Sequence, residues 1–175
     1  MSLRTRLALL ALMLPVAAWA QMFGINDDAR WTEIQAQLPE YPKTENYLPF
    51  KASATTPFDF YVDAKSINAG NDGVMRYSLI AKSSTGALNV SFEGIRCSQR
   101  EYRIYAFGRA DNTWSEARGS RWQPIPMDAR NTQRTVLYND FLCPGGVMAT
   151  ADEGQQALRN GGGYPQQQQT RPSGP

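Results

Sequence analysis

The side chains best suited to chemistry in this sequence are arginines and aromatic rings in its second half. Between Arg96 and Arg134 the chain has eight arginines and four acidic residues, with aromatic residues interleaved. Guanidinium groups beside aromatic faces suit anionic or sugar-bearing ligands. We therefore expect a binding face at five of these residues: Arg103, Tyr105, Trp114, Arg121 and Trp122. The alternative is a solvated sheet face with arginine stems along it and tryptophans in the core.

Catalytic chemistry has little support in the sequence. The chain has no histidine, which excludes Ser-His-Asp and Cys-His catalysis. Asp59 and Asp63 share a predicted strand face, but at roughly 3.3 Å per residue they lie about 13 Å apart, beyond the carboxylate spacing of glycosidases. Carboxylates brought together by folding, such as Glu93 with another acid, remain an alternative. We expect no enzyme here, and no catalytic residue, metal or cofactor.

The two cysteines, Cys97 and Cys143, are expected to form one structural disulfide. A zinc site draws about four ligands from Cys, His and carboxylates, and the absence of histidine argues against it. A thioredoxin-like redox role needs a C-x-x-C pair, which this sequence lacks.

The first 20 residues have the three parts of a secretory signal peptide. Arg4 and Arg6 begin it, an apolar run follows, and Ala18-Trp19-Ala20 ends it with small residues. Cleavage is expected between Ala20 and Gln21, which places the mature chain in the periplasm, where disulfides persist. The cell surface and secretion are the alternative destinations of an exported chain. The apolar run is too short to span a bilayer, so no membrane span is expected in the mature chain.

The mature chain is expected to be electrically neutral. The full sequence has 18 Lys+Arg and 16 Asp+Glu, and the signal peptide removes two arginines and no acids. Binding to nucleic acid relies on excess positive charge, so nucleic acid is not an expected partner.

The middle of the chain reads as β-structure. Four segments with apolar alternation are joined by short turns: Phe58–Asp63, Val74–Lys82, Leu88–Cys97 and Glu101–Arg109. Short turns favour an antiparallel meander, because parallel strands need long crossovers. In the last segment, strict alternation places Tyr102, Ile104 and Ala106 on one face and Arg103, Tyr105 and Phe107 on the other.

Helices and an extended segment flank these strands. Residues 28–37 fit a short helix, and the prolines of Pro39–Pro57 favour an extended strap. Residues 131–142 fit a second helix, capped by Asp128 or Asn131, that ends at Cys143. The expected fold is an α+β sandwich with a meander of about four to six strands, one or two helices on one face, and one disulfide. Gly, Gln and Pro dominate residues 152–175, which are expected to form a disordered tail.

Several strings in the mature chain resemble the CNP-like family of exported bacterial proteins. They run from about residue 31 to residue 147, and they are Leu38-Pro39-x-Tyr41-Pro42, Leu48-Pro49-Phe50, Phe60-Tyr61-Val62-Asp63-Ala64-x-Ser66, Asn89-Val90-Ser91-Phe92-Glu93-Gly94-Ile95-Arg96-Cys97, Tyr105-Ala106-Phe107-Gly108-Arg109 and Val136-Leu137-Tyr138-x-Asp140-Phe141-x-Cys143-Pro144. The resemblance implies a CNP-like α+β domain over residues 21–151 and a periplasmic location. It adds no chemistry.

The chain is also similar, more faintly, to the surface-adhesin-E-like domains. The shared features are a Val-Asp-x-x-Ser strand, a cysteine late in the meander, a Trp-x-Pro-Ile segment and a cysteine on the last helix; here these are Val62–Ser66, Cys97, Trp122–Ile125 and Cys143. This similarity implies an envelope or surface binding module, and ligand preferences do not carry over with it.

The functional hypothesis is a non-enzymatic periplasmic or envelope-associated domain. It would bind an envelope protein or an anionic envelope component through the region Arg103–Trp122. One alternative is a carboxylate-dependent envelope hydrolase, and another is a purely structural envelope factor.

The signal peptide gives a direct prediction. Expression of the full chain in a Gram-negative bacterium should yield a periplasmic product. Its intact mass should equal that of a chain beginning at Gln21, because the small residues Ala18 and Ala20 define the cleavage site. The Ala20→Arg variant should accumulate as the precursor. A cytoplasmic full-length product from the unchanged chain would contradict the assignment.

Overall fold

The computed structural model describes residues 31–53, 56–127 and 132–162. The chain divides into two units, residues 1–32 and residues 33–175. All the elements below belong to the second unit. The predicted signal peptide and the predicted cleavage site lie outside the described residues.

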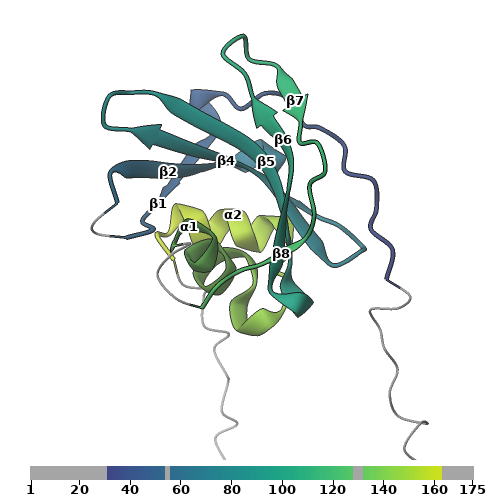
Figure 1. Cartoon of the computed structure of the whole chain (residues 1–175). Helices are drawn as coiled ribbons and strands as arrows, with labels where there is room; N and C mark the ends of the chain where they lie inside the picture. The colour runs from purple at the N-terminus through teal and green to yellow at the C-terminus, as the bar shows by residue number, and fades with distance from the viewer. Residues whose placement is uncertain (1–30, 54–55, 128–131, 163–175) are drawn as a thin grey trace, which may run out of the picture. The chain divides into compact units, whose positions relative to one another are not determined.

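Within the described residues, eight strands form one antiparallel sheet (Figure 1). Its order is β1-β2-β4-β5-β6-β7, with β3 paired to β4 and β8 paired to β6. The bounds are β1 Tyr47–Phe50, β2 Phe58–Asp63, β3 Asn68–Ala69, β4 Val74–Ser83, β5 Leu88–Arg96, β6 Glu101–Gly108, β7 Trp114–Glu116 and β8 Gln123–Pro124. The predicted meander is confirmed in its four long strands, and the short strands extend it.

Part of the proline-rich segment Pro39–Pro57, which was predicted to be extended, is an edge strand. Tyr47–Phe50 pairs with β2, and Pro49 lies opposite Tyr61. Proline has no amide hydrogen to donate, so it is tolerated in a strand that has a neighbour on one side only. This part of the segment is therefore extended, as its prolines predict, and it is also paired at the edge of the sheet.

A β-bulge corrects the predicted alternation of β6. The pairing of β5 with β6 shifts between Phe92 and Glu93, so that Phe92 lies opposite Ala106 and Glu93 lies opposite Ile104. Tyr105 is the extra residue. Ala106 therefore lies on the same face as Arg103, and Phe107 lies on the other face, the reverse of the prediction. A bulge re-aims the side chains that follow it in this way.

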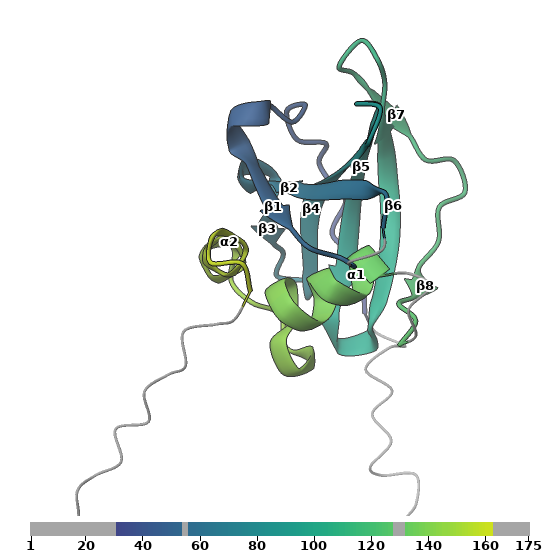
Figure 2. The ribbon, with the colours of Figure 1, turned by 90° about the vertical axis from the view of Figure 1, so that its left-hand side faces the viewer.

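Two helical segments pack on one face of the sheet, which we call the inner face (Figures 1 and 2). Helix α1 (Thr132–Val136) continues as a π-helix (Leu137–Leu142), as the sequence predicted, while the proposed caps at Asp128 and Asn131 lie outside the described residues. The expected disulfide joins Cys97, after β5, to Cys143, with the two Cα atoms 5.5 Å apart. The Tyr138 hydroxyl also donates to the Cys97 carbonyl at 2.9 Å. The α+β prediction is confirmed.

The predicted tail is wrong over residues 152–159, which belong to helix α2 (Ala151–Arg159). Thr150 and Glu153 form a capping box: Thr150 accepts from the Glu153 amide, and Glu153 accepts from the Thr150 amide. Ala157 and Leu158 are buried in the core. The string Thr150-x-x-Glu153 was the missed signal. Residues 163–175 lie outside the described residues.

The predicted helix over residues 28–37 is also wrong where it is described, because residues 31–43 have no regular secondary structure. Residues 33–43, here called the strap, lie on the outer face of the sheet: the Tyr41 hydroxyl meets the Arg109 carbonyl at 3.3 Å and the Trp114 indole donates to the Pro39 carbonyl at 2.9 Å. That face is itself apolar, with five buried residues apart from the inner core: Val74, Ile80, Val90, Phe92 and Ala106. Local helix propensity was overridden by these long-range contacts.

The disulfide should contribute strongly to stability. Replacing both Cys97 and Cys143 with alanine should lower the free energy of unfolding by about 4 kcal/mol, because the bridge closes a long loop in the unfolded chain. Urea unfolding of the variant and the oxidised wild type checks this. Wild-type protein unfolded with reductant should match the variant, and equal midpoints for oxidised and reduced wild type would contradict the expectation.

Candidate functional site

Three of the five predicted binding residues converge on a carboxylate of the strap. Glu33 Oε2 accepts from Arg103 Nη1 at 2.7 Å and from Trp122 Nε1 at 3.2 Å, while Glu33 Oε1 accepts from the Tyr105 hydroxyl at 2.6 Å. Arg76 Nη2 lies 3.8 Å from Glu33 Oε1. We call Arg76, Arg103, Tyr105 and Trp122 the carboxylate nest. It is partly enclosed, since the Glu33 side chain is 17% exposed.

The residue after Glu33 is held through its main chain. The Ile34 amide donates to Asp72 Oδ2 at 2.8 Å, and the Ile34 carbonyl accepts from Arg76 Nη2 at 2.8 Å. Arg76 and Asp72 are themselves paired at 2.6 Å, with side chains 6% and 1% exposed. Two adjacent strap residues are therefore recognised by different means, the first by its carboxylate and the second by its backbone.

Electrostatics stabilise the charge states of these groups. Burial raises the pKa of the Tyr105 hydroxyl and the Glu33 carboxylate raises it further, so the phenol stays a hydrogen-bond donor. Burial alone would raise the pKa of Asp72, but the hydrogen bonds from Arg76 and the Ile34 amide hold it below its usual value. A phenol, two guanidinium groups and an indole facing one carboxylate make an anion site of high complementarity.

The other two predicted residues do not join the nest through any contact seen in the described residues. The Trp114 ring packs against Tyr41 in a tilted arrangement, with ring centroids 5.3 Å apart, and its centroid lies 6.2 Å from that of Phe92. Arg121 is exposed next to Trp122. Trp114 is only partly buried and lies outside the core, so the alternative of tryptophans in the core does not describe it. The contacts of Arg103, Tyr105 and Trp122 with Glu33 are those that an anion-binding face would make.

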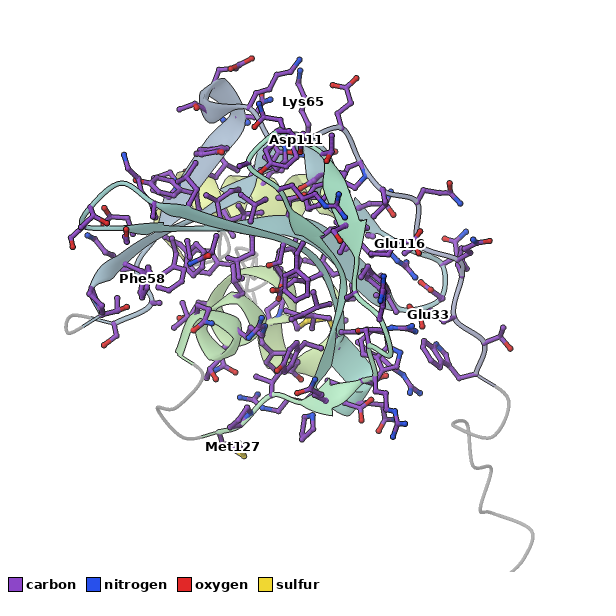
Figure 3. The ribbon with its side chains drawn as sticks, turned by 45° about the horizontal axis from the view of Figure 1, so that its top comes forward. Glu33, Phe58, Lys65, Asp111, Glu116 and Met127 are labelled. Atoms are coloured by element: carbon purple, nitrogen blue, oxygen red, sulfur yellow. A yellow bond between two sulfur atoms is a disulfide. The ribbon has the colours of Figure 1, made fainter. Side chains whose placement is uncertain are left out.

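A hollow of about 310 Å³ lies between the strap and the loop after β7. Glu33 and Glu116 both line it, and they lie on the same side of the molecule (Figure 3). Leu38 and Ile34, on its strap side, are 41% and 50% exposed. The strap therefore crosses the outer face without filling the space beside it.

The inner face carries a second charged site. Glu93, on β5, is fully buried, and Arg134 from α1 binds it through two nitrogens at 2.7 and 2.8 Å. The Ser91 hydroxyl donates to Glu93 Oε1 at 2.6 Å, and the Tyr77 hydroxyl meets Oε2 at 3.4 Å. Burial alone would lower the pKa of Arg134, but the Glu93 carboxylate raises it above its usual value. The pair is a charged anchor between helix and sheet.

Beside this pair the inner face is open. A hollow of about 340 Å³ has an apolar wall of Phe60, Leu79, Ala81, Ile104 and Phe107, and Ser91 and Arg134 also line it. A neighbouring hollow of about 730 Å³ shares Phe60 and is bounded by Phe50, Val136 and Phe141. We call the two hollows together the inner cleft. Phe107 is 49% exposed at its edge, and only the bulge at Tyr105 places it there.

Glu93 is poorly placed for the hydrolase alternative. The hydrogen bonds described for its carboxylate come from Tyr77, Ser91 and Arg134, and none joins it to a second acidic side chain. Across residues 31–53, 56–127 and 132–162, no three His, Cys, Asp or Glu side chains gather where they would hold a metal ion. The helices in these same ranges are all too short or too polar to cross a membrane.

Sequence reasoning missed Glu33, Asp72 and Arg76. Glu33 was assigned to a helix and Asp72 to a turn, while Arg76 precedes the arginine-rich stretch. Asp72 and Arg76 are only four residues apart, but Glu33 reaches Arg76 from a distant segment, and the sequence has no local signal for that contact. The buried Glu93 was identified as a carboxylate of interest, but its partner is a base and not an acid.

Comparison with known proteins gives one family. The model of the CNP1-like family matches residues 26–160, a range that includes helix α2. The chain is similar to "Cryptic neisserial protein 1" of Neisseria gonorrhoeae (strain ATCC 700825 / FA 1090), with 29% identity over 166 residues that cover 79% of this chain and 81% of the relative. No solved structure matches.

The buried pair predicts a strong coupling. Glu93→Gln or Arg134→Met alone should lower the free energy of unfolding by about 3–5 kcal/mol, because each leaves a buried charge without its partner. The double variant Glu93→Leu/Arg134→Met should recover most of that loss in urea unfolding. Glu101→Gln, which breaks a partly exposed pair with Arg96, should cost less than about 1 kcal/mol. Equal costs for Glu93→Gln and Glu101→Gln would contradict the assignment.

Proposed function

The chain belongs to the CNP1-like family, and from that premise we propose that it is an exported, non-enzymatic binding module of the bacterial cell envelope. The signal-peptide pattern predicted over residues 1–20 supports export. The Cys97–Cys143 disulfide supports it as well, because such bridges persist in oxidising compartments.

The observation that carries the binding role is the inner cleft. Phe60, Leu79 and Ile104 offer apolar surface from three strands, and α1 covers only part of the face they form. Ligand sites in proteins are commonly concave, mostly apolar and supplied with a few polar groups. The proposed ligand is therefore an apolar or amphipathic envelope molecule.

The polar groups of the cleft favour binding over catalysis. Glu93 accepts hydrogen bonds from Arg134 and Ser91, so its carboxylate is engaged by side chains of the protein and does not face a substrate alone. Ser91 has no histidine to activate it, because the chain has none. A purely structural envelope factor would have no need of an open apolar cleft.

The test uses N-phenyl-1-naphthylamine, an uncharged apolar dye that brightens in apolar sites. We expect saturable binding to the purified protein. The Ala81→Gln variant places an amide in the apolar wall and should weaken dye binding roughly tenfold or more, since burying an unpaired polar group costs about 1–3 kcal/mol.

Lys82→Gln is the matched control, because Lys82 neighbours Ala81 on β4 but points to the opposite face and is exposed. It should bind the dye as the wild type does. Absence of saturable binding to folded wild-type protein would refute the proposal, and so would an equal loss in both variants.

A further inference from the structure

We propose that the carboxylate nest is a peptide-recognition site for an acidic segment of another envelope protein, and that the strap occupies it as a tethered competitor. The proposal goes beyond the inner cleft and concerns the opposite face of the sheet. It rests on what the strap itself shows, since residues 33 and 34 are bound as a short peptide would be.

The first subsite reads an acidic side chain. Arg103, Tyr105 and Trp122 donate to Glu33 at 2.7, 2.6 and 3.2 Å, and each Glu33 oxygen has its own donors. These donors come from β6 and from the loop before β8. A carboxylate that accepts several charged and neutral donors is recognised far better than an amide of the same shape.

The second subsite reads main chain. Asp72 accepts the Ile34 amide and Arg76 donates to the Ile34 carbonyl, both at 2.8 Å, while the Ile34 side chain stays 50% exposed. Backbone contacts of this kind do not depend on the side chain. The site therefore fits an aspartate or glutamate followed by any residue except proline, which has no amide hydrogen.

The nest is built for a peptide more than for a phosphate. Asp72 Oδ2 lies at the second subsite, where the Ile34 amide now donates to it. A phosphate would satisfy the arginines, but it would bring a second anion next to Asp72 without an N–H group to offer. A peptide brings a carboxylate and an amide hydrogen at the required spacing.

The strap is suited to release. Residues 33–43 make no strand pairing and no helix, and a hollow of about 310 Å³ lies beside residues 34–38. Its attachment is intramolecular, so its effective concentration is high and a free peptide must compete with it. Release would uncover a site that is already shaped, because Arg76 is held by Asp72 and Gly94 leaves room for the Tyr105 ring.

The experiment measures binding of a fluorescein-labelled peptide with the sequence of residues 31–39 to the full chain. The strap-release variant Glu33→Ala/Ile34→Pro removes the Glu33 carboxylate and the Ile34 amide hydrogen from the nest, and it should bind the peptide at least tenfold more tightly than the wild type. Adding Arg103→Met to that variant should reduce binding at least tenfold. Glu40→Ala is the matched control: Glu40 is another strap acid, but its side chain is 87% exposed and its ion pair is with Lys43 at 3.9 Å, so wild-type affinity is expected.

A second peptide, with glutamine in place of its glutamate, should bind the release variant at least tenfold more weakly. If the release variant does not fold, Glu33→Gln serves in its place, and a high concentration of the acidic peptide should shift the Trp122 indole N–H resonance of that variant. Equal affinity of the wild type and the released protein would overturn the proposal, as would equal binding of the two peptides. Competition by inorganic phosphate at the potency of the acidic peptide would replace it with a simple anion site. None of these results bears on dye binding in the inner cleft.

Discussion

The fold depends on one constraint: its sheet is apolar on both faces. Met75, Tyr77 and Ile95 belong to the core beneath the helices, while Val74, Ile80 and Phe92 are buried on the other side. A sheet of this kind exposes apolar surface to water unless both faces are covered, and that burial is the main favourable term in folding. Among the described residues, helices lie on one face and one extended segment, the strap, lies on the other.

Charged residues on the sheet determine where each cover lies. Glu93 faces inward and is matched by Arg134 of α1, whereas Arg76 and Arg103 face outward and are matched by Glu33 of the strap. A buried charge without a partner costs several kcal/mol, so the pairing is specific even where its net contribution is small. Apolar contact alone would not fix the position of helix α1 or of the strap on the sheet.

Both proposed sites exist because helix α1 and the strap each bury only part of the sheet face on which they pack. Helix α1 leaves open the part of the inner face around Phe107, which becomes the inner cleft. The strap crosses the outer face beside a hollow, and it contacts the carboxylate nest and Asp72 through two residues, Glu33 and Ile34. The bulge at Tyr105 links the two sites, because it keeps Tyr105 on the outer face and turns Phe107 to the inner one.

Much of this architecture could be predicted from the sequence, because its signals are local. Alternating apolar residues and short turns indicated the meander, and the single cysteine pair indicated the disulfide that is present. The capping box at Thr150 was also readable, although the composition around it pointed to a tail. Tertiary structure alone decided the rest. No local pattern shows that Glu33 leaves a helix to meet Arg103, some 70 residues away, or that one extra residue in β6 reverses the faces of Ala106 and Phe107. Local propensity is worth tenths of a kcal/mol per residue, and contacts between distant segments outweigh it once the sheet has brought those segments together.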